Sequence, residues 1–258
     1  MRISDARFAI VDTETSGLDP ADSELLEIGA VLSDWRGKII DRFETLVKPT
    51  KPLTADNSAI HGLIDEDFAK AKTIDSASYQ FLWWLPDDTI IVTHHLEFDR
   101  GFLPWIADRQ GLCSKRLASH LCPDSPSSKN QVLRYWFKDV ARDPHIRALG
   151  DTHRAIADAT VTATILPHLI DIYLAQGGED DIDALIAFAE SPYLIKHMWL
   201  GKHYGKPIAE IDKSYLVWAL QTIDLDRDQR FTLEHYTLGE PVDAEWFEPW
   251  IEAVQANA

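Results

Sequence analysis

The sequence predicts an α/β fold in which a mixed β-sheet is flanked by helices. Segments typical of strands follow one another early, at residues 8–11, 25–33 and 38–47, and helical segments then alternate with a further strand at 89–95. Strands in succession, followed by alternating helices and strands, are typical of such a sheet. With 258 residues, 45% of them hydrophobic, the chain can bury one core and still carry a small appendage.

The first strand, residues 8–11, is an apolar run that leads directly into Asp12, Thr13 and Glu14. Alternate residues of a strand point to the same face, so we expect the carboxylates of Asp12 and Glu14 to share one cation. Gly17 permits a tight turn that keeps the backbone close to this position. The end of the first strand is therefore a candidate metal site.

The next elements complete the sheet and its first helices. Residues 25–33 form an apolar run, and residues 38–47 alternate apolar and polar side chains as a half-exposed strand does. Helices are predicted at 77–85 and at 100–110. The tryptophans Trp83, Trp84 and Trp136 are interpreted as core residues rather than as platforms for stacked bases.

Two later segments carry further polar candidates. Asp99 follows the buried strand predicted at 89–95, near its end. A helix is predicted over residues 152–174, and it begins with His153 and Asp158. These two residues lie ~140° apart around the helix axis. Both are therefore expected to flank a site that lies across the N-terminal end of the helix.

Together these residues form the set that a two-metal phosphodiester hydrolase needs. Cations of the magnesium class prefer carboxylate oxygens, and two of them ~4 Å apart stabilise the attacking and leaving oxygens at phosphorus. A histidine that titrates near neutral pH is suited to take a proton from water. We expect two divalent cations, Mg²⁺ with Mn²⁺ as a substitute, at Asp12, Glu14, Asp99 and Asp158.

Three ordered segments resemble the motifs of the DEDDh branch of the proofreading-type 3′→5′ exonuclease superfamily. DTETSG at 12–17 resembles the first motif, His95–Asp99 the second and His153–Asp158 the third. Residues 24–32 and 59–62 also resemble the family's second strand and the loop that faces the terminal nucleotide. The resemblance covers most of the first two thirds of the chain and implies a ribonuclease H-like sheet.

The resemblance implies a role for each catalytic candidate. Asp12 would bridge both metal ions, and Asp99 would hold one of them through water. Glu14 and Asp158 would complete the other. His153 would act as general base on the attacking water.

The resemblance also implies a substrate. The enzyme would release nucleoside 5′-monophosphates from a free 3′ end of DNA, and Thr15, Leu18 and His61 would receive the terminal nucleotide. Two alternatives stay open: an RNA-trimming 3′→5′ exoribonuclease built on the same site, and a catalytically idle nucleic-acid-binding module. Fit around the 2′-hydroxyl separates DNA from RNA, and an idle module would have lost a metal carboxylate, whereas this chain keeps all of them.

One position departs from the family pattern, because His95 replaces the asparagine that usually precedes the FD of the second motif. Its side chain would either satisfy backbone groups near the strand end or touch the substrate or a metal ion. The first interpretation is favoured. Asp99 itself is intact, so the metal site is unaffected.

We predict an exonuclease domain at 1–175, a linker helix region at 176–195 and a small α+β domain at 196–258. The last resembles the domain that follows the nuclease in exodeoxyribonuclease X-like proteins, with its Gly-Lys, aromatic, Gly-Lys pattern and a YLxW helix. Lys202 and Lys206 are expected to hold phosphates of the substrate. A structural cap or a contact with a protein partner is the alternative.

The net charge of −17 favours weak non-specific binding to nucleic acid, because binding phosphates normally needs a basic face. Residues 171–258 hold 17 acidic and 6 basic groups, so most of the excess lies in the tail. No run of 18 apolar residues and no signal-peptide pattern is present, so we expect a cytoplasmic protein without a membrane span. Cys113 and Cys122 are expected to be free thiols.

Overall fold

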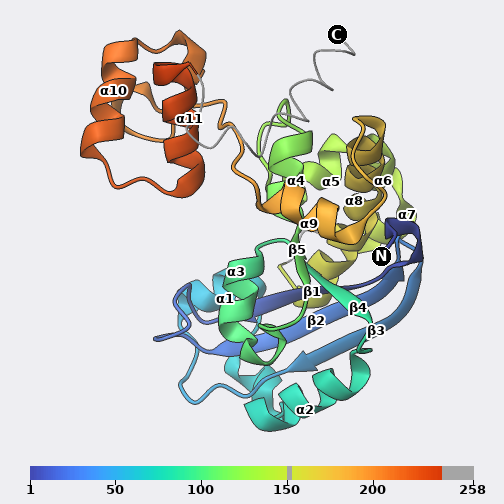
Figure 1. The fold of residues 1–258 in the computed structure, drawn as a ribbon. Coiled ribbons are helices and arrows are strands. Elements are labelled where there is room, and N and C mark those ends of the chain that lie inside the picture. The colour runs from blue at the N-terminus through green and yellow to red at the C-terminus, as the bar shows by residue number, and fades with distance from the viewer. Residues whose placement is uncertain (150–152, 240–258) are drawn as a thin grey trace.

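A computed structural model describes residues 1–149 and 153–239 (Figure 1). In these residues one sheet has five strands in the order β3-β2-β1-β4-β5. Strands β1, β2 and β3 pair antiparallel, whereas β4 and β5 add parallel to β1, so the sheet is mixed as predicted. The strands are β1 (Arg7–Thr15), β2 (Leu25–Asp34), β3 (Ile39–Leu46), β4 (Thr89–Thr93) and β5 (Gly111–Cys113).

Helices flank the sheet, as predicted. Those before β5 are α1 (Ala55–His61), α2 (Ile74–Trp84) and α3 (Leu96–Phe102). Those after it are α4 (Ser114–Leu121), α5 (Asn130–Trp136), α6 (Lys138–Arg142), α7 (Pro144–Ala148), α8 (Ala155–Ala175) and α9 (Ile182–Glu190). Short 3₁₀ turns lie at Ile3–Asp5, Asp65–Lys70 and Pro104–Ile106.

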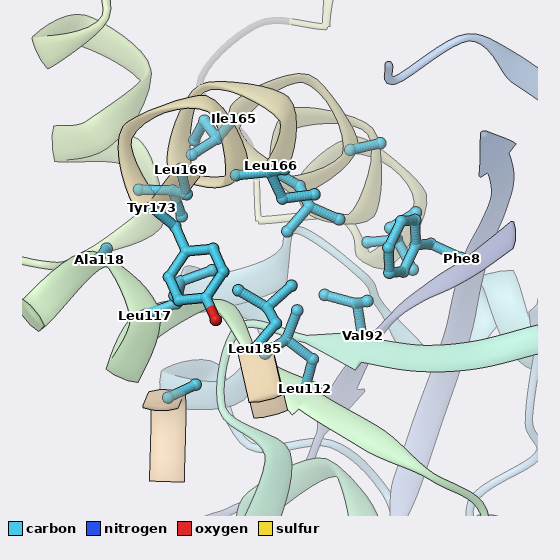
Figure 2. Packing of buried hydrophobic residues seen from close by; sticks show 14 of the residues in the cluster. Phe8, Val92, Leu112, Leu117, Ala118, Ile165, Leu166, Leu169, Tyr173 and Leu185 are labelled. Atoms are coloured by element: carbon cyan, nitrogen blue, oxygen red, sulfur yellow. The ribbon is translucent and has the colours of Figure 1, made fainter. Parts of the chain in front are cut away.

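Alternation along β1 sends its side chains into two cores. Phe8 and Ile10 face one core together with α4, α8 and α9 (Figure 2), while Ala9 and Val11 face the other, toward α2 and α3. Helix α8 is long and apolar enough to cross a membrane, but 67% of its most apolar window is buried in the protein. Its apolar side chains therefore pack in the core of the protein. Its contacts with β1 and β2 bring its N-terminal end to the sheet.

One helix differs from its prediction. The helix expected at 100–110 begins instead at Leu96 and ends at Phe102, so Asp99 lies inside a helix. The ring of His95 caps the first turn by accepting a hydrogen bond from the backbone N–H of Phe98 at 3.3 Å. Pro104 has no N–H to continue the helix and begins a separate 3₁₀ turn.

The C-terminal unit, residues 196–239 as described, has a small core of its own that includes Met198, Leu216 and Leu233. It contains α10 (Lys213–Thr222), α11 (Arg227–Leu238) and 3₁₀ turns at Gly201–His203 and Ile208–Glu210. The strand content expected here amounts, within these residues, to one isolated antiparallel bridge between His197 and Pro207. The turn at Gly201–His203 interrupts the hairpin before a ladder can form. Residues 240–258 of the predicted domain lie outside the described part.

The region predicted as a linker is partly core. Helix α9 contributes Ile182, Leu185 and Ala189 to the same core as α8. The guanidinium of Arg116 on α4 then joins the two parts of the protein, because it donates to the backbone oxygen of Ser191 at 2.8 Å and to both carboxylate oxygens of Asp228, at 2.6 and 3.0 Å. Asp228 lies in the first turn of α11, so this ion pair links the C-terminal unit to the nuclease core.

Candidate active site

Three of the four expected metal ligands meet at the end of β1. Asp12 and Glu14 project from β1, and Asp158 projects from the first turn of α8. One carboxylate oxygen of each lies within 4.8 Å of the others. Glu14 and Asp158 are buried, whereas Asp12 is partly exposed. Converging oxygen donors at this separation fit the coordination of a divalent cation.

Asp99 lies beside this cluster but outside the 4.8 Å group. Its side chain is buried, and Thr13 Oγ1 donates a hydrogen bond of 2.8 Å to its Oδ1. Burial raises the pKa of Asp99 to about 6, against the opposing hydrogen bonds from Thr13 and Thr93. Its charge also raises the pKa of Asp12, so the two carboxylates are close enough to interact.

The electrostatics of the cluster are unfavourable to four ionised carboxylates. Burial raises the pKa of Asp12 well above its usual range, and the charges of Asp99 and Asp158 add to this effect. Burial likewise raises the pKa of Glu14 to about 8, with further contributions from Asp158 and Glu27. A bound cation supplies the opposing charge and favours the ionised forms. The donor set therefore fits a divalent metal ion.

Two amides on α5 hold Asp158 in place. Gln131 Nε2 donates to Asp158 Oδ1 at 2.7 Å, and Asn130 Nδ2 donates to the backbone oxygen of Asp158 at 3.1 Å. Burial raises the pKa of Asp158, while the hydrogen bond from Gln131 lowers it. The sequence analysis missed both amides, because an isolated Asn-Gln pair carries no local signal of its partner.

An ion pair between a half-exposed arginine and a buried glutamate fixes the N-terminal end of α8. Arg154, the residue before the helix, donates to Glu27 on β2 through Nε at 3.0 Å and Nη2 at 2.6 Å. Glu27 is fully buried and also accepts the backbone N–H of Ala155 at 3.1 Å. Glu27 faces Glu14 in the strand register, so the pair lies next to the carboxylate cluster. Sequence reasoning missed this pair too, since Glu27 lies within an apolar strand.

His153 directly precedes Arg154 and is exposed. Its charge lowers the pKa of Asp158, which places the imidazole near the cluster. The structure thus brings His153 to the N-terminal end of α8, as the spacing predicted. The helix itself begins at Ala155, and residues 150–152 of the predicted helix region lie outside the described residues.

The residues expected to bind a nucleotide fall into two groups. Thr15 and Leu18 lie where β1 ends, and the Leu18 side chain is 85% exposed, although it is apolar. His61, in contrast, is 1% exposed, and its Nδ1 accepts the backbone N–H of Leu63 at 3.1 Å. His61 is therefore turned inward, and its ring is not available to a nucleotide in this arrangement.

His95 behaves as the favoured interpretation predicts. Its Nδ1 caps α3, which is the role of satisfying backbone groups near the strand end. The adjacent His94 bridges the Ser114 hydroxyl at 3.0 Å and the backbone oxygen of Ser128 at 2.8 Å. Burial lowers the pKa of His94 to about 4, so it remains neutral and structural.

The tryptophan interpretation holds for one residue and fails for two. Trp84 packs against Phe43 and Phe81, with ring centroids 5.7 and 5.9 Å away. Trp83 is 83% exposed and Trp136 is 41% exposed, so neither is a core residue. Successive residues on a helix point about 100° apart, so only one of the neighbouring pair faces the core.

Lys202 and Lys206 lie in the C-terminal unit, away from the carboxylate cluster.

Comparison with known proteins agrees with this site. Residues 9–166 match the family model for exonucleases. The chain is 34% identical over 173 residues to the PolC-type DNA polymerase III of Thermotoga maritima, covering 65% of this chain but 12% of that polymerase. It is 27% identical over 234 residues to exodeoxyribonuclease 10 of Escherichia coli, covering 88% of this chain and 97% of that protein.

Solved structures give the same result. Exonuclease X in complex with 5′-overhanging duplex DNA superposes with a TM-score of 0.55 at 26% identity, over 70% of this chain and 99% of that one. Exonuclease I of E. coli in complex with a dT13 oligonucleotide superposes with a TM-score of 0.55 at 16% identity, over 70% of this chain and 46% of that one, which shows the shared fold. The chain therefore belongs to the exonuclease family, in the DEDDh branch of 3′→5′ exonucleases.

Proposed function

We propose that this protein is a Mg²⁺-dependent 3′→5′ exodeoxyribonuclease that releases nucleoside 5′-monophosphates. The observation that carries the proposal is the meeting of Asp12, Glu14 and Asp158 within 4.8 Å, with Asp99 beside them. All four carboxylates are present, which disfavours an idle binding module. When bound, two divalent ions supply positive charge to the attacking and leaving oxygens.

Each residue has a role within this proposal. Asp12, whose pKa responds to Asp99, Asp158 and Glu14, lies centrally and would be shared by both ions. Glu14 and Asp158 would complete the coordination of one ion, and Asp99 would hold the other. His153 would take the proton of the attacking water, because it is exposed, lies beside Asp158 and belongs to the residue type best suited to that task near neutral pH.

The terminal nucleotide would bind where β1 ends. The exposed Leu18 side chain offers apolar surface to a base, and the backbone at Thr15 lies next to the metal carboxylates. Asn57 on α1 donates to the backbone oxygen of Ser16 at 2.8 Å and so holds this loop in place. We assign no nucleotide contact to His61, whose ring is buried. His95 is exposed, and its cap of α3 uses only Nδ1, so the rest of its ring can still meet the substrate.

DNA is favoured over RNA because the match to exodeoxyribonuclease 10 covers 88% of this chain and 97% of that protein. The test uses DNA and RNA strands of one sequence, single-stranded and duplex, labelled at the 5′ or the 3′ end, with Mg²⁺ or with chelator. We expect mononucleotides from the 3′ end of DNA only when Mg²⁺ is present. Faster shortening of RNA would support the exoribonuclease instead, and no shortening of either would support a binding module.

A further inference from the structure

The C-terminal unit presents a compact basic and aromatic surface on an otherwise acidic tail. Residues 201–206 form a loop whose ends are held by hydrogen bonds from Met198 N to Lys206 O and from Gly205 N to Met198 O, both 2.8 Å. Gly201 and Gly205 adopt positive φ angles of 61° and 77°, which favour glycine. The loop is therefore a defined structure that exposes Lys202, Tyr204 and Lys206.

The cations of this loop lie close together. Desolvation lowers the pKa of the intervening His203, the charges of Lys202 and Lys206 lower it further, and the charge of Asp212 opposes them. Among residues 1–149 and 153–239, no carboxylate lies at ion-pair distance from Lys202 or Lys206, whereas Lys196 pairs with Asp124. Two neighbouring ammonium groups without an acidic partner form a surface suited to a polyanion.

Aromatic side chains accompany the cations. Tyr204 is 77% exposed and Trp218 on α10 is 45% exposed. Tyr215 joins the loop to α10, since its ring lies 4.5 Å from that of His203 and 5.2 Å from that of Trp218. The Lys202 ammonium lies 5.6 Å from the same Tyr215 ring. Exposed rings next to cations are the combination that binds single strands, with bases stacked on the rings and phosphates on the cations.

Resting on the exonuclease function proposed above, we propose that residues 201–206 with Tyr215 and Trp218 bind the single-stranded part of the substrate away from its 3′ end. The Arg116–Asp228 ion pair links the unit that carries this surface to α4 of the nuclease core. Figure 1 shows α10 and α11 standing apart from the sheet, joined to α9 by an extended segment. The surface therefore engages long strands and leaves the reacting end to the carboxylates.

The test compares strand lengths with the full chain. One substrate is a single strand of about 20 nucleotides, longer than the ~4–16 that one binding module covers, and the other is a trinucleotide. Lys202→Ala/Lys206→Ala should raise KM for the long strand at least fivefold, with kcat and the KM for the trinucleotide unchanged. Tyr204→Ala should raise KM for the long strand as well. Lys38→Ala/Lys138→Ala, which removes two exposed lysines of the nuclease domain, is the matched control. It should change neither kcat nor KM for either substrate.

Salt dependence of binding gives a second readout that does not need cleavage. In chelator, the slope of log affinity against log salt for the long strand should become shallower by about 1.4 in the double lysine variant, which corresponds to two phosphate contacts. Lys202→Arg/Lys206→Arg should keep the wild-type slope. Wild-type slope and KM in a Lys202→Ala/Lys206→Ala protein with a native melting temperature would overturn the proposal. Absence of cleavage by wild type would contradict the exonuclease function but leave this binding test valid.

Discussion

Arg154 donates hydrogen bonds from two nitrogens, Nε and Nη2, to the carboxylate of Glu27. This one ion pair joins β2 to the N-terminal end of α8, the helix that carries Asp158. Arg154 also accepts, through its backbone oxygen, the N–H groups of Ala157 and Asp158 at 2.9 and 3.0 Å. Glu27 therefore fixes Arg154, which follows His153 in the sequence, and with it the start of α8 and the position of Asp158. The pair is a positioning device for the site rather than a part of its chemistry.

Removing Glu27 should weaken catalysis more than folding. In Glu27→Ala the helix end loses its anchor, and a misplacement of about 1 Å can cost about 10²-fold in rate. We expect kcat to fall by about 10- to 100-fold with a smaller change in KM. The stability loss should be below the 3–5 kcal/mol typical of broken buried pairs, because Arg154 is 35% exposed and keeps Glu44 at 3.2 Å.

Glu44→Ala is the matched control for this prediction. Glu44 is the exposed partner of the same arginine, so its loss should change stability by about 0–1 kcal/mol and leave kcat near wild type. The comparison uses steady-state kinetics of Glu27→Ala and Glu44→Ala at a temperature below the melting temperature of each variant. Wild-type kcat in a folded Glu27→Ala protein would show that the pair does not position the site.

Gly29→Ala should displace the same helix end by steric contact. A Cβ at Gly29 would lie 2.1 Å from Ile156 N and 2.2 Å from Ala155 C, which are backbone atoms and cannot rotate away. Overpacking of this kind typically costs about 1–3 kcal/mol. We expect a lower melting temperature together with a loss of kcat, measured by thermal unfolding and by assays on the protein that remains folded. A variant as stable and as active as wild type would mean that α8 approaches β2 less closely.

Stability without metal should depend on pH through Glu14. Its pKa of about 8 in the folded protein lies above the ordinary value of 4.5, so the folded state keeps a proton that the unfolded chain loses. Stability from this group is therefore complete below pH ~4.5 and is lost as pH rises toward about 8. In chelator, Glu14→Gln should reduce the fall in melting temperature between pH 5 and pH 8.5. An unchanged fall would assign the effect to other carboxyls.

His153→Ala should lower kcat by about 10²–10⁴, the usual contribution of a positioned general base. Metal affinity should stay near wild type, because the carboxylates are retained. The wild-type rate should rise with pH across the range in which histidines lose their proton, and this limb should vanish in the variant. If the limb persists in His153→Ala, another group accepts the proton.

Local rules predicted the parts of the site that lie on one element. The two-residue period of a strand placed Asp12 and Glu14 together, and the spacing of His153 and Asp158 placed both at one helix end. Glu27, Arg154 and Gln131 could not be predicted, because their partners lie far away in sequence and nothing local distinguishes them from ordinary polar residues. His61 was predicted as a nucleotide contact, yet the turn at Gly62 directs its ring inward to Leu63.

Strand prediction failed in the C-terminal unit for a related reason. Its Gly-Lys pattern indicates a hairpin, and a hairpin-like loop is present, with backbone hydrogen bonds between Met198 and Lys206. The 3₁₀ turn at Gly201–His203 and the packing of Met198 against helices limit the pairing to one bridge. Tertiary packing, rather than local pattern, decided the outcome here.

The most direct test of the central claim is release of mononucleotide from a 3′-labelled strand by wild type, Asp12→Ala and Asp108→Ala. Asp108 is an exposed carboxylate outside the site and serves as the control. Wild type and Asp108→Ala should release mononucleotide with Mg²⁺ and stop in chelator. Asp12→Ala should remain folded, because it removes one carboxylate from a crowded acidic cluster, and should release none. Release by Asp12→Ala at close to the wild-type rate would contradict the assignment of the carboxylate cluster as the catalytic metal site.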